Sequence, residues 1–309
     1  MGHPLRVALL KKGNEMLTRK RYTYIGYLYI LPWIIGFLVL QLAPLINSFW
    51  YSFTNFQLLG DPKFLGLDNY KKIFTNDPTF LQSLKVTSYY VLIAVPLKLS
   101  FALLIAIILN QNIKGINFFR TLYYIPSILG GSVAISVLWK YLFMNQGIVN
   151  NLLSVVGIPA TDWLGDPRYA LGTISLVTVW QFGSSMLLFL AGLKQIPVSQ
   201  YEAARIDGAG RLRIFAQITI PELSPIILFN LIMQMINAFQ DFTSAFVITQ
   251  GGPLKSTYLY GLMLYDQGFK FFKMGYSSAL SWILFVIILF FTSLTFRSSE
   301  SWVHYGDSL

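Results

Sequence analysis

Long stretches of this chain carry almost no charged residues, and this feature limits the folds open to it more than any other. No charged residue lies between Arg21 and Asp61, and the segment 86–113 contains a single one, Lys98. A bilayer core about 30 Å thick is crossed by about 20 apolar residues in a helix. The sequence therefore predicts six transmembrane helices, at residues 25–48, 85–110, 119–143, 169–193, 222–248 and 275–297.

The composition also indicates an all-α integral membrane protein. Hydrophobic residues make up 55% of the chain and charged residues 12%, and the mean hydropathy is +0.57. We expect one transmembrane domain at 25–297, a basic segment before it at 1–24 and a short tail at 298–309. The basic segment has the pattern of a short amphipathic helix on the inner membrane surface. The length of the first apolar run favours a retained span over a cleaved signal peptide.

The net charge of +10 follows membrane topology and does not indicate a nucleic-acid partner. With the N-terminus inside, the inner segments hold more Lys and Arg residues than the outer ones, and the cluster before the first span dominates. The positive-inside rule then predicts a multi-pass protein of the bacterial cell membrane with both termini in the cytoplasm. It also places the polar segment 194–221 on the cytoplasmic side. The chain has no cysteine, so disulfides and thiol chemistry are excluded.

The polar segment 194–221 lies between two apolar runs and has the signals of a short surface helix. Ser199 and Glu202 have the S-x-x-E spacing of a capping box. Gly208 lies where a helix of about two turns would end in a left-handed conformation. A short helix held between two spans can be displaced by a soluble partner and can transmit that displacement to the membrane spans.

Polar side chains recur along one face of the predicted fifth span. They follow the helical period at intervals of four, three and four residues: Asn230, Gln234, Asn237 and Asp241. Amides and carboxylates in hydrocarbon are costly, so this face should look into the protein or onto a watery path. Two interpretations stay open. The stripe lines a path for a hydroxyl-rich solute, or it holds neighbouring helices together.

Residues in other spans are further candidates for the path. Trp180 and Gln181 lie in the predicted fourth span and would either meet substrate or pack within the bundle. Lys98 lies inside the second span, where it is either a pathway charge or a lysine that is paired or extends to the interface.

Few residues would support catalysis. His3 and His304 lie near the two ends of the sequence, and no H-E-x-x-H motif or phosphate loop is present. We therefore expect no enzymatic activity, no metal site and no ATP binding through a phosphate loop in this chain.

The segment 202–221 resembles the EAA signature of ABC importer permeases. Glu202, Ala203 and Ala204 are followed by Gly208 and, at the expected spacing, by Ile218 and Pro221, while Ile220 replaces the usual leucine. The sequences at 196–197, 206–209 and 251–253 resemble the carbohydrate branch of the family, the maltose-type permeases. The sequence GLDNY at 66–70 resembles the first of the two permeases that such systems pair.

The resemblance implies a type I ABC importer permease fold with a cytoplasmic coupling helix. It also implies a second permease subunit, two cytoplasmic ABC ATPase subunits that hold ATP and Mg, and an extracytoplasmic solute-binding protein. This chain would carry no cofactor. The implied substrate is a carbohydrate, with an oligosaccharide expected and a disaccharide or glycerol phosphate fitting as well. The signature assigns six residues to ATPase coupling: Glu202, Ala203, Ala204, Asp207, Gly208 and Pro221.

An ion- or proton-coupled secondary transporter of a polar solute is the alternative. Such a protein needs buried ionisable groups near broken helices. Only Lys98 and Asp241 come near that description, and the sequence shows no evident partner for either. A membrane enzyme is less favoured, because neither a nucleophile nor a metal-binding set is present.

Overall fold

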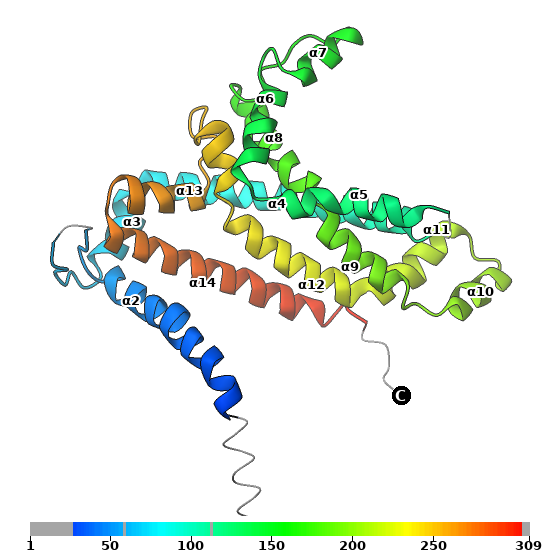
Figure 1. The fold of residues 1–309 in the computed structure, drawn as a ribbon, viewed down its shortest axis with the longest axis horizontal. Helices are drawn as coiled ribbons and strands as arrows, with labels where there is room; N and C mark the ends of the chain where they lie inside the picture. The colour runs from blue at the N-terminus through cyan, green and yellow to red at the C-terminus, as the bar shows by residue number, and fades with distance from the viewer. Residues whose placement is uncertain (1–26, 58–59, 112–113, 305–309) are drawn as a thin grey trace, which may run out of the picture.

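The computed structural model describes residues 27–57, 60–111 and 114–304 of the chain. Helices and short connections make up this part, and its one isolated β-bridge joins Thr54 to Phe64. The predicted all-α class is therefore confirmed (Figure 1). The amphipathic helix predicted within residues 1–24 lies outside the described residues.

Long apolar helices form the body of the molecule, and α4 (Pro78–Leu109), α12 (Ile220–Phe239) and α14 (Met274–Ser299) run along its length (Figure 1). The first predicted span is a helix over Tyr27–Ser52 that includes the π-helical turn η1 (Leu38–Leu42) and α2 (Ala43–Ser52), which packs against α14. Four described helices are long and apolar enough to cross a membrane, and two bent helix pairs bring the number to six.

The third and fourth spans are broken, so the uninterrupted helices predicted at 119–143 and 169–193 are wrong. α5 (Ile116–Leu129) meets the helical segment Val133–Val155 at 101°, and α8 (Pro167–Trp180) meets α9 (Gly183–Leu193) at 48°. The segment Val133–Val155 contains α6 (Val133–Phe143) and α7 (Ile148–Val155).

The first break has a local cause, and the second involves a close contact between two helices. Gly131 has a φ of 77°, a left-handed conformation that favours glycine. The Ser132 hydroxyl then accepts a hydrogen bond from the Ile135 N–H at 3.2 Å and caps the new helix α6. At the second break, Gly183 lies against α5, where an added Cβ would come within 2.6 Å of the Tyr123 carbonyl oxygen.

The fifth span also ends earlier than predicted. α12 stops at Phe239, and a turn precedes the π-helical segment η3 (Ala245–Thr249). Asp241 therefore lies beyond the helix that carries Asn230, Gln234 and Asn237, so the predicted single helical face holds for three of the four residues. The chain then forms α13 (Tyr260–Tyr265) and η4 (Asp266–Lys270) before α14.

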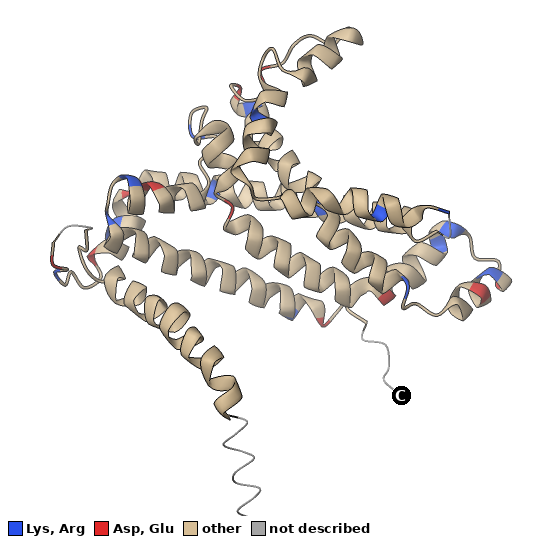
Figure 2. Ribbon diagram, in the orientation of Figure 1, with Lys and Arg blue, Asp and Glu red and all other residues tan. Residues whose placement is uncertain are grey.

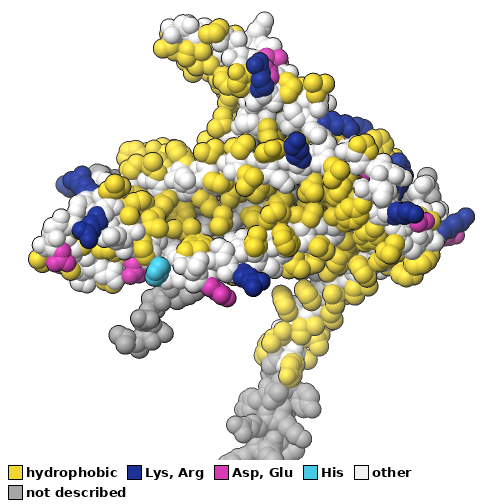
Figure 3. Space-filling view, turned by 180° about the vertical axis from the view of Figure 1, so that it is seen from behind, with side chains coloured by type: hydrophobic (Ala, Val, Ile, Leu, Met, Phe, Trp, Pro, Cys, Tyr) yellow, Lys and Arg dark blue, Asp and Glu magenta, His cyan; other side chains and the backbone are white. Residues whose placement is uncertain are grey.

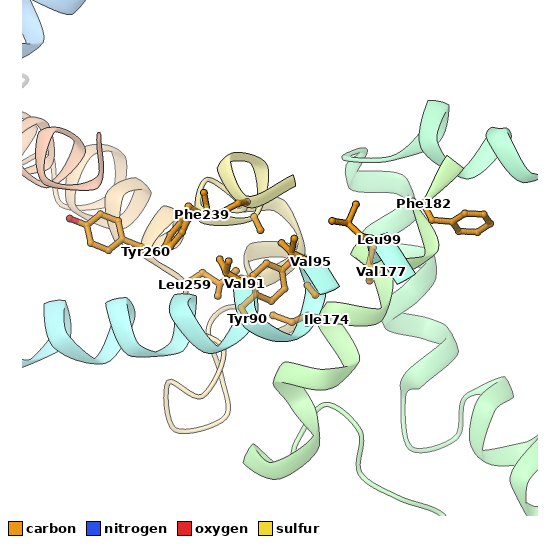
Figure 4. Packing of buried hydrophobic residues seen from close by; sticks show 14 of the residues in the cluster. Tyr90, Val91, Val95, Leu99, Ile174, Val177, Phe182, Phe239, Leu259 and Tyr260 are labelled. Atoms are coloured by element: carbon orange, nitrogen blue, oxygen red, sulfur yellow. The ribbon is translucent and has the colours of Figure 1, made fainter. Parts of the chain in front are cut away.

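The helix α4 is central to the packing. It contacts α8, α9, α12 and α13, and its buried residues Tyr90, Val91 and Val95 lie beside side chains from these neighbours (Figure 4). A helix that is apolar on nearly all sides is typical of a bundle core within a membrane. Because α4 runs through the core of the bundle, the position of a residue along α4 determines how far its side chain lies from either end of the bundle.

The surface has the distribution of charge expected for a membrane-spanning bundle. Most charged residues lie toward the ends of the long helices or on the connections between them (Figure 2), and hydrophobic side chains cover much of the face shown in Figure 3. The exposed hydrophobic side chains of the molecule include Leu92 on α4 and Phe290 on α14. At one end lies α3 (Asp68–Asn76), and at the other lie α10 (Val198–Ile206) and α11 (Arg211–Ile214) (Figure 1).

Candidate functional site

The predicted coupling segment forms the short helix α10, which ends as the sequence predicts. Gly208 has a φ of 76°. Its N–H donates to the Arg205 carbonyl at 3.0 Å, and the Ala209 N–H donates to the Ala204 carbonyl at 2.9 Å. These two bonds form a Schellman motif, which satisfies carbonyl groups that the helix end would otherwise leave open. The predicted left-handed helix end at Gly208 is confirmed.

The predicted capping box at the start of this helix is wrong. α10 begins at Val198 with Pro197 at the N-cap position, and no side chain caps it. Ser199 therefore lies inside the first turn, where its hydroxyl is misplaced for capping. The Glu202 side chain takes no part in a cap, and Glu202 is exposed on the surface of α10.

An open hollow of about 430 Å³ lies between α10 and the start of α12. Four of the predicted coupling residues line it: Ala203, Ala204, Asp207 and Pro221. At the same place the Gln200 Nε2 donates to the Glu222 Oε1 at 3.1 Å, and the Tyr201 and Thr219 hydroxyls are 3.3 Å apart. α10 is thus fastened to the base of the helix that continues through η2 (Phe215–Thr219) into α12.

A second site lies inside the bundle, where the broken spans meet. A cavity of about 250 Å³ there is lined by polar groups from α4, α5, α6, α8, α12 and the breaks between helices. Four of the six predicted path residues line this mid-membrane cavity together with Lys98: Gln181, Gln234, Asn237 and Asp241. The structure therefore brings together residues from the second, fourth and fifth spans.

Hydrogen bonds join the two broken spans beside the cavity. The Ser127 hydroxyl of α5 donates to the Gln181 carbonyl at 3.1 Å and accepts from the Ser184 N–H at 3.0 Å. The Gln181 side chain lies over Gly130, where an added Cβ would be 2.6 Å from its Oε1. Backbone groups freed by a helix break inside a membrane need such partners.

Asp241 is held by hydroxyl groups from two other parts of the chain. The Tyr90 hydroxyl donates to its Oδ2 and also lies 2.6 Å from the Thr178 hydroxyl oxygen. The Ser244 hydroxyl donates to the same carboxylate at 2.6 Å. The sequence shows no evident partner for Asp241, and the structure supplies these two hydroxyl partners. The contact with Tyr90 could not be predicted, because the two residues are 151 positions apart in the sequence. The one signal available was a tyrosine inside a long apolar run, where its hydroxyl would need a hydrogen-bond partner.

Lys98 and the two remaining path candidates differ in their surroundings. Lys98 lines the cavity, and within the described residues it makes no hydrogen bond or ion pair. Asn230 is buried and donates to the Ile226 carbonyl of its own helix at 3.1 Å. Trp180 packs against Trp139 with a centroid separation of 5.6 Å. Asn230 and Trp180 do not line the cavity, so the structure gives them a packing environment.

A bundle of up to six apolar spans around a polar cavity is the arrangement expected of a membrane transport subunit. Residues 80–300 match the family described as binding-protein-dependent transport system inner membrane component, and the chain belongs to this family. The resemblance identified from the EAA signature is thereby confirmed.

Individual relatives agree along nearly the full chain. The probable ABC transporter permease protein YesP of Bacillus subtilis strain 168 is 52% identical over 283 residues, which cover 91% of this chain and 92% of YesP. The arabinooligosaccharides transport system permease protein AraP of the same organism is 32% identical over 307 residues, covering 97% and 96%. These names support an ABC permease and give no support to a secondary transporter.

A solved structure confirms the fold. The chain superimposes on a subunit of a bacterial ABC transporter involved in the import of the acidic polysaccharide alginate with a TM-score of 0.80 at 20% identity, covering 93% of this chain and 99% of the other. The chain therefore has the type I ABC importer permease fold.

Proposed function

We propose that this chain lines the translocation path of an ATP-driven importer whose cargo is a carbohydrate, specifically an oligosaccharide. The observation that carries the proposal is the mid-membrane cavity, where Gln181, Gln234 and Asn237 present amides beside Asp241. An amide both donates and accepts hydrogen bonds, so this lining suits a ligand rich in hydroxyl groups. AraP, named for arabinooligosaccharide transport, supports the choice of cargo.

The second half of the path would come from another permease subunit. Asn237 lines the cavity and is nevertheless exposed, so the cavity is open on its side of α12. A second permease seated there would complete the wall. An extracytoplasmic solute-binding protein would deliver the sugar to the outer end of the pair, with both termini of this chain in the cytoplasm.

Energy would enter through α10. Two ABC ATPase subunits would hold ATP and Mg and would seat against the hollow lined by Ala203, Ala204 and Asp207. Because α10 is hydrogen-bonded to the base of the helix that leads into α12, displacement of α10 would move Gln234 and Asn237 at the cavity. The chain itself would hydrolyse nothing and would act as a two-state element between the ATPases and the sugar.

Uptake into proteoliposomes tests this function. The four-subunit transporter would be reconstituted with its solute-binding protein, and entry of labelled oligosaccharides would be followed with ATP, without ATP and with a proton gradient alone. We expect concentrative uptake only when ATP and the solute-binding protein are both present. Concentrative uptake driven by the proton gradient without ATP would contradict the proposal.

A further inference from the structure

The ammonium group of Lys98 lies deep in the bundle without a protein partner among the described residues. Lys98 is 7% exposed and lines the mid-membrane cavity. At 1.5 Å per residue, about 16 Å of α4 separates it from Leu109 and about 30 Å separates it from Pro78. A lysine side chain is too short to extend from this depth to either membrane surface. The ammonium group therefore has to be satisfied inside the cavity.

Asp241 does not supply that partner directly. Its Oδ2 accepts hydrogen bonds from Tyr90 and Ser244, and no ion pair within 4.0 Å joins it to Lys98. A charged amine in a membrane interior is costly and is normally paired. Asp241 lines the same cavity, but its Oδ2 already accepts two hydrogen bonds and the carboxylate lies beyond ion-pair distance of the ammonium, so the ammonium is placed to bind an anionic group on a ligand in the cavity.

We propose that Lys98 selects a carbohydrate that bears a carboxylate, such as a uronate-containing oligosaccharide. This inference rests on the proposed function and deepens it. The ligand carboxylate would bind the Lys98 ammonium with a charge-assisted hydrogen bond. The ligand hydroxyls would bind the side-chain amides of Gln181 and Gln234, and one ligand hydroxyl would donate a hydrogen bond to Asp241. The Asp241 carboxylate is itself stabilised by the hydrogen bonds that it accepts from Tyr90 and Ser244.

A carboxylate of the second permease is the competing partner for Lys98. The geometry favours the ligand, because Lys98 lies on the buried side of α4, while the cavity that it lines is open at Asn237. A structural ion pair with the other subunit would make Lys98 necessary for assembly. A contact with the ligand would make it necessary only for the acidic cargo.

The test is uptake of two matched probes by the complete reconstituted transporter with its solute-binding protein. Digalacturonate carries the carboxylates, and its carboxyl-reduced form, a galactose disaccharide, lacks them. In Lys98→Met we expect the ratio of acidic to neutral uptake to fall about tenfold or more relative to wild type, and Lys98→Arg should largely restore it. Because the same solute-binding protein serves every variant, the change in this ratio reports on the permease.

Lys85→Met is the matched control, since Lys85 lies on the same helix but is exposed and outside the cavity. It should leave the ratio unchanged. If the wild-type transporter takes up the neutral disaccharide and not digalacturonate, the inference is overturned and the proposed importer function still holds. Loss of the second permease from purified Lys98→Met complexes would also overturn it, in favour of the structural ion pair. If Lys98→Met reduces uptake of glycerol 3-phosphate more than uptake of digalacturonate, a carboxylate is the wrong choice of anionic group.

Discussion

The coupling end and the mid-membrane cavity are built in opposite ways. The coupling helix and the hollow beside it come from one continuous stretch, 198–222, and their main contacts join residues close in sequence. The cavity combines residues up to 154 positions apart in the sequence, from Tyr90 to Ser244, at points where three helices stop. A contiguous segment can be recognised as one sequence motif, whereas the lining of an assembled cavity can change by single substitutions in separate helices. This contrast suits a transporter whose coupling to the ATPase stays constant while its substrate varies.

The largest expected effect is at the coupling end. Glu202→Lys should reduce co-purification of the ATPase subunits and ATP-driven uptake about tenfold or more, because it reverses an exposed charge at the proposed docking surface. Membrane insertion should be unchanged. Glu300→Lys, a charge reversal at an exposed residue that follows α14, is the control. Normal ATPase binding by the Glu202 variant would remove that residue from the coupling surface.

The next-largest effect is expected at the mid-membrane cavity, on the stability of the protein. Tyr90→Phe removes the hydroxyl that binds both Asp241 and Thr178, and we expect a loss of about 1–3 kcal/mol in the free energy of unfolding. Thermal unfolding of the purified complex measures it. ATPase docking should not change. The neighbouring substitution Tyr89→Phe is the control, since Tyr89 is exposed and does not line the cavity. Equal stability of the two variants would contradict the assigned role of the Tyr90 hydroxyl.

A smaller effect is expected at the end of the coupling helix. Gly208→Ala places a side chain at a φ of 76°, which costs roughly 1–2 kcal/mol in a left-handed conformation. We expect weaker ATPase binding in a pull-down assay, with the cavity unaffected. Gly210→Ala, at a φ of −70°, should bind the ATPase normally. If both variants behave alike, the left-handed turn at Gly208 has no special role.

The smallest effect is expected at the open wall of the cavity. Asn237→Leu should change the rate or the preference among oligosaccharides several-fold, because it removes one donor and one acceptor while keeping a similar size. Uptake measurements with a panel of sugars would show it. The second permease should still co-purify. Loss of assembly with unchanged selectivity would instead support a role in holding helices together.

Much of the fold could be predicted from the sequence, since the apolar runs gave the approximate position of every span. The helix end at Gly208 was also predictable, because a local motif determines it. The breaks at Gly131 and Gln181 were not predicted, because no charged residue interrupts either run. The glycine and serine residues at 130–132 were a local signal for the first break, whereas the second depends on the contact of Gly183 with α5. Pro197 displaced the expected cap at Ser199 for a local reason, since the helix starts directly after the proline.

The cavity was predicted in part. Periodicity in the fifth span identified Gln234 and Asn237, but it also included Asn230, which bonds to its own helix. The pairing of Tyr90 with Asp241 depends on contacts between distant spans, which one sequence does not reveal. Helical period indicates which face is polar, and only packing shows which part of that face borders an open space.

A displacement of α10 should reach the cavity through α12, and the reactivity of a single cysteine at the cavity would report it. The chain has no native cysteine, so Asn237→Cys provides a single reporter at the open wall. Its reaction rate with a membrane-impermeant thiol reagent would be compared, in complexes with cysteine-free partners, without ATP and after trapping with ATP and vanadate. We expect a several-fold change in rate between the two states and the loss of that change when Glu202→Lys is added. Equal rates in both states, or a change that persists with Glu202→Lys, would contradict it.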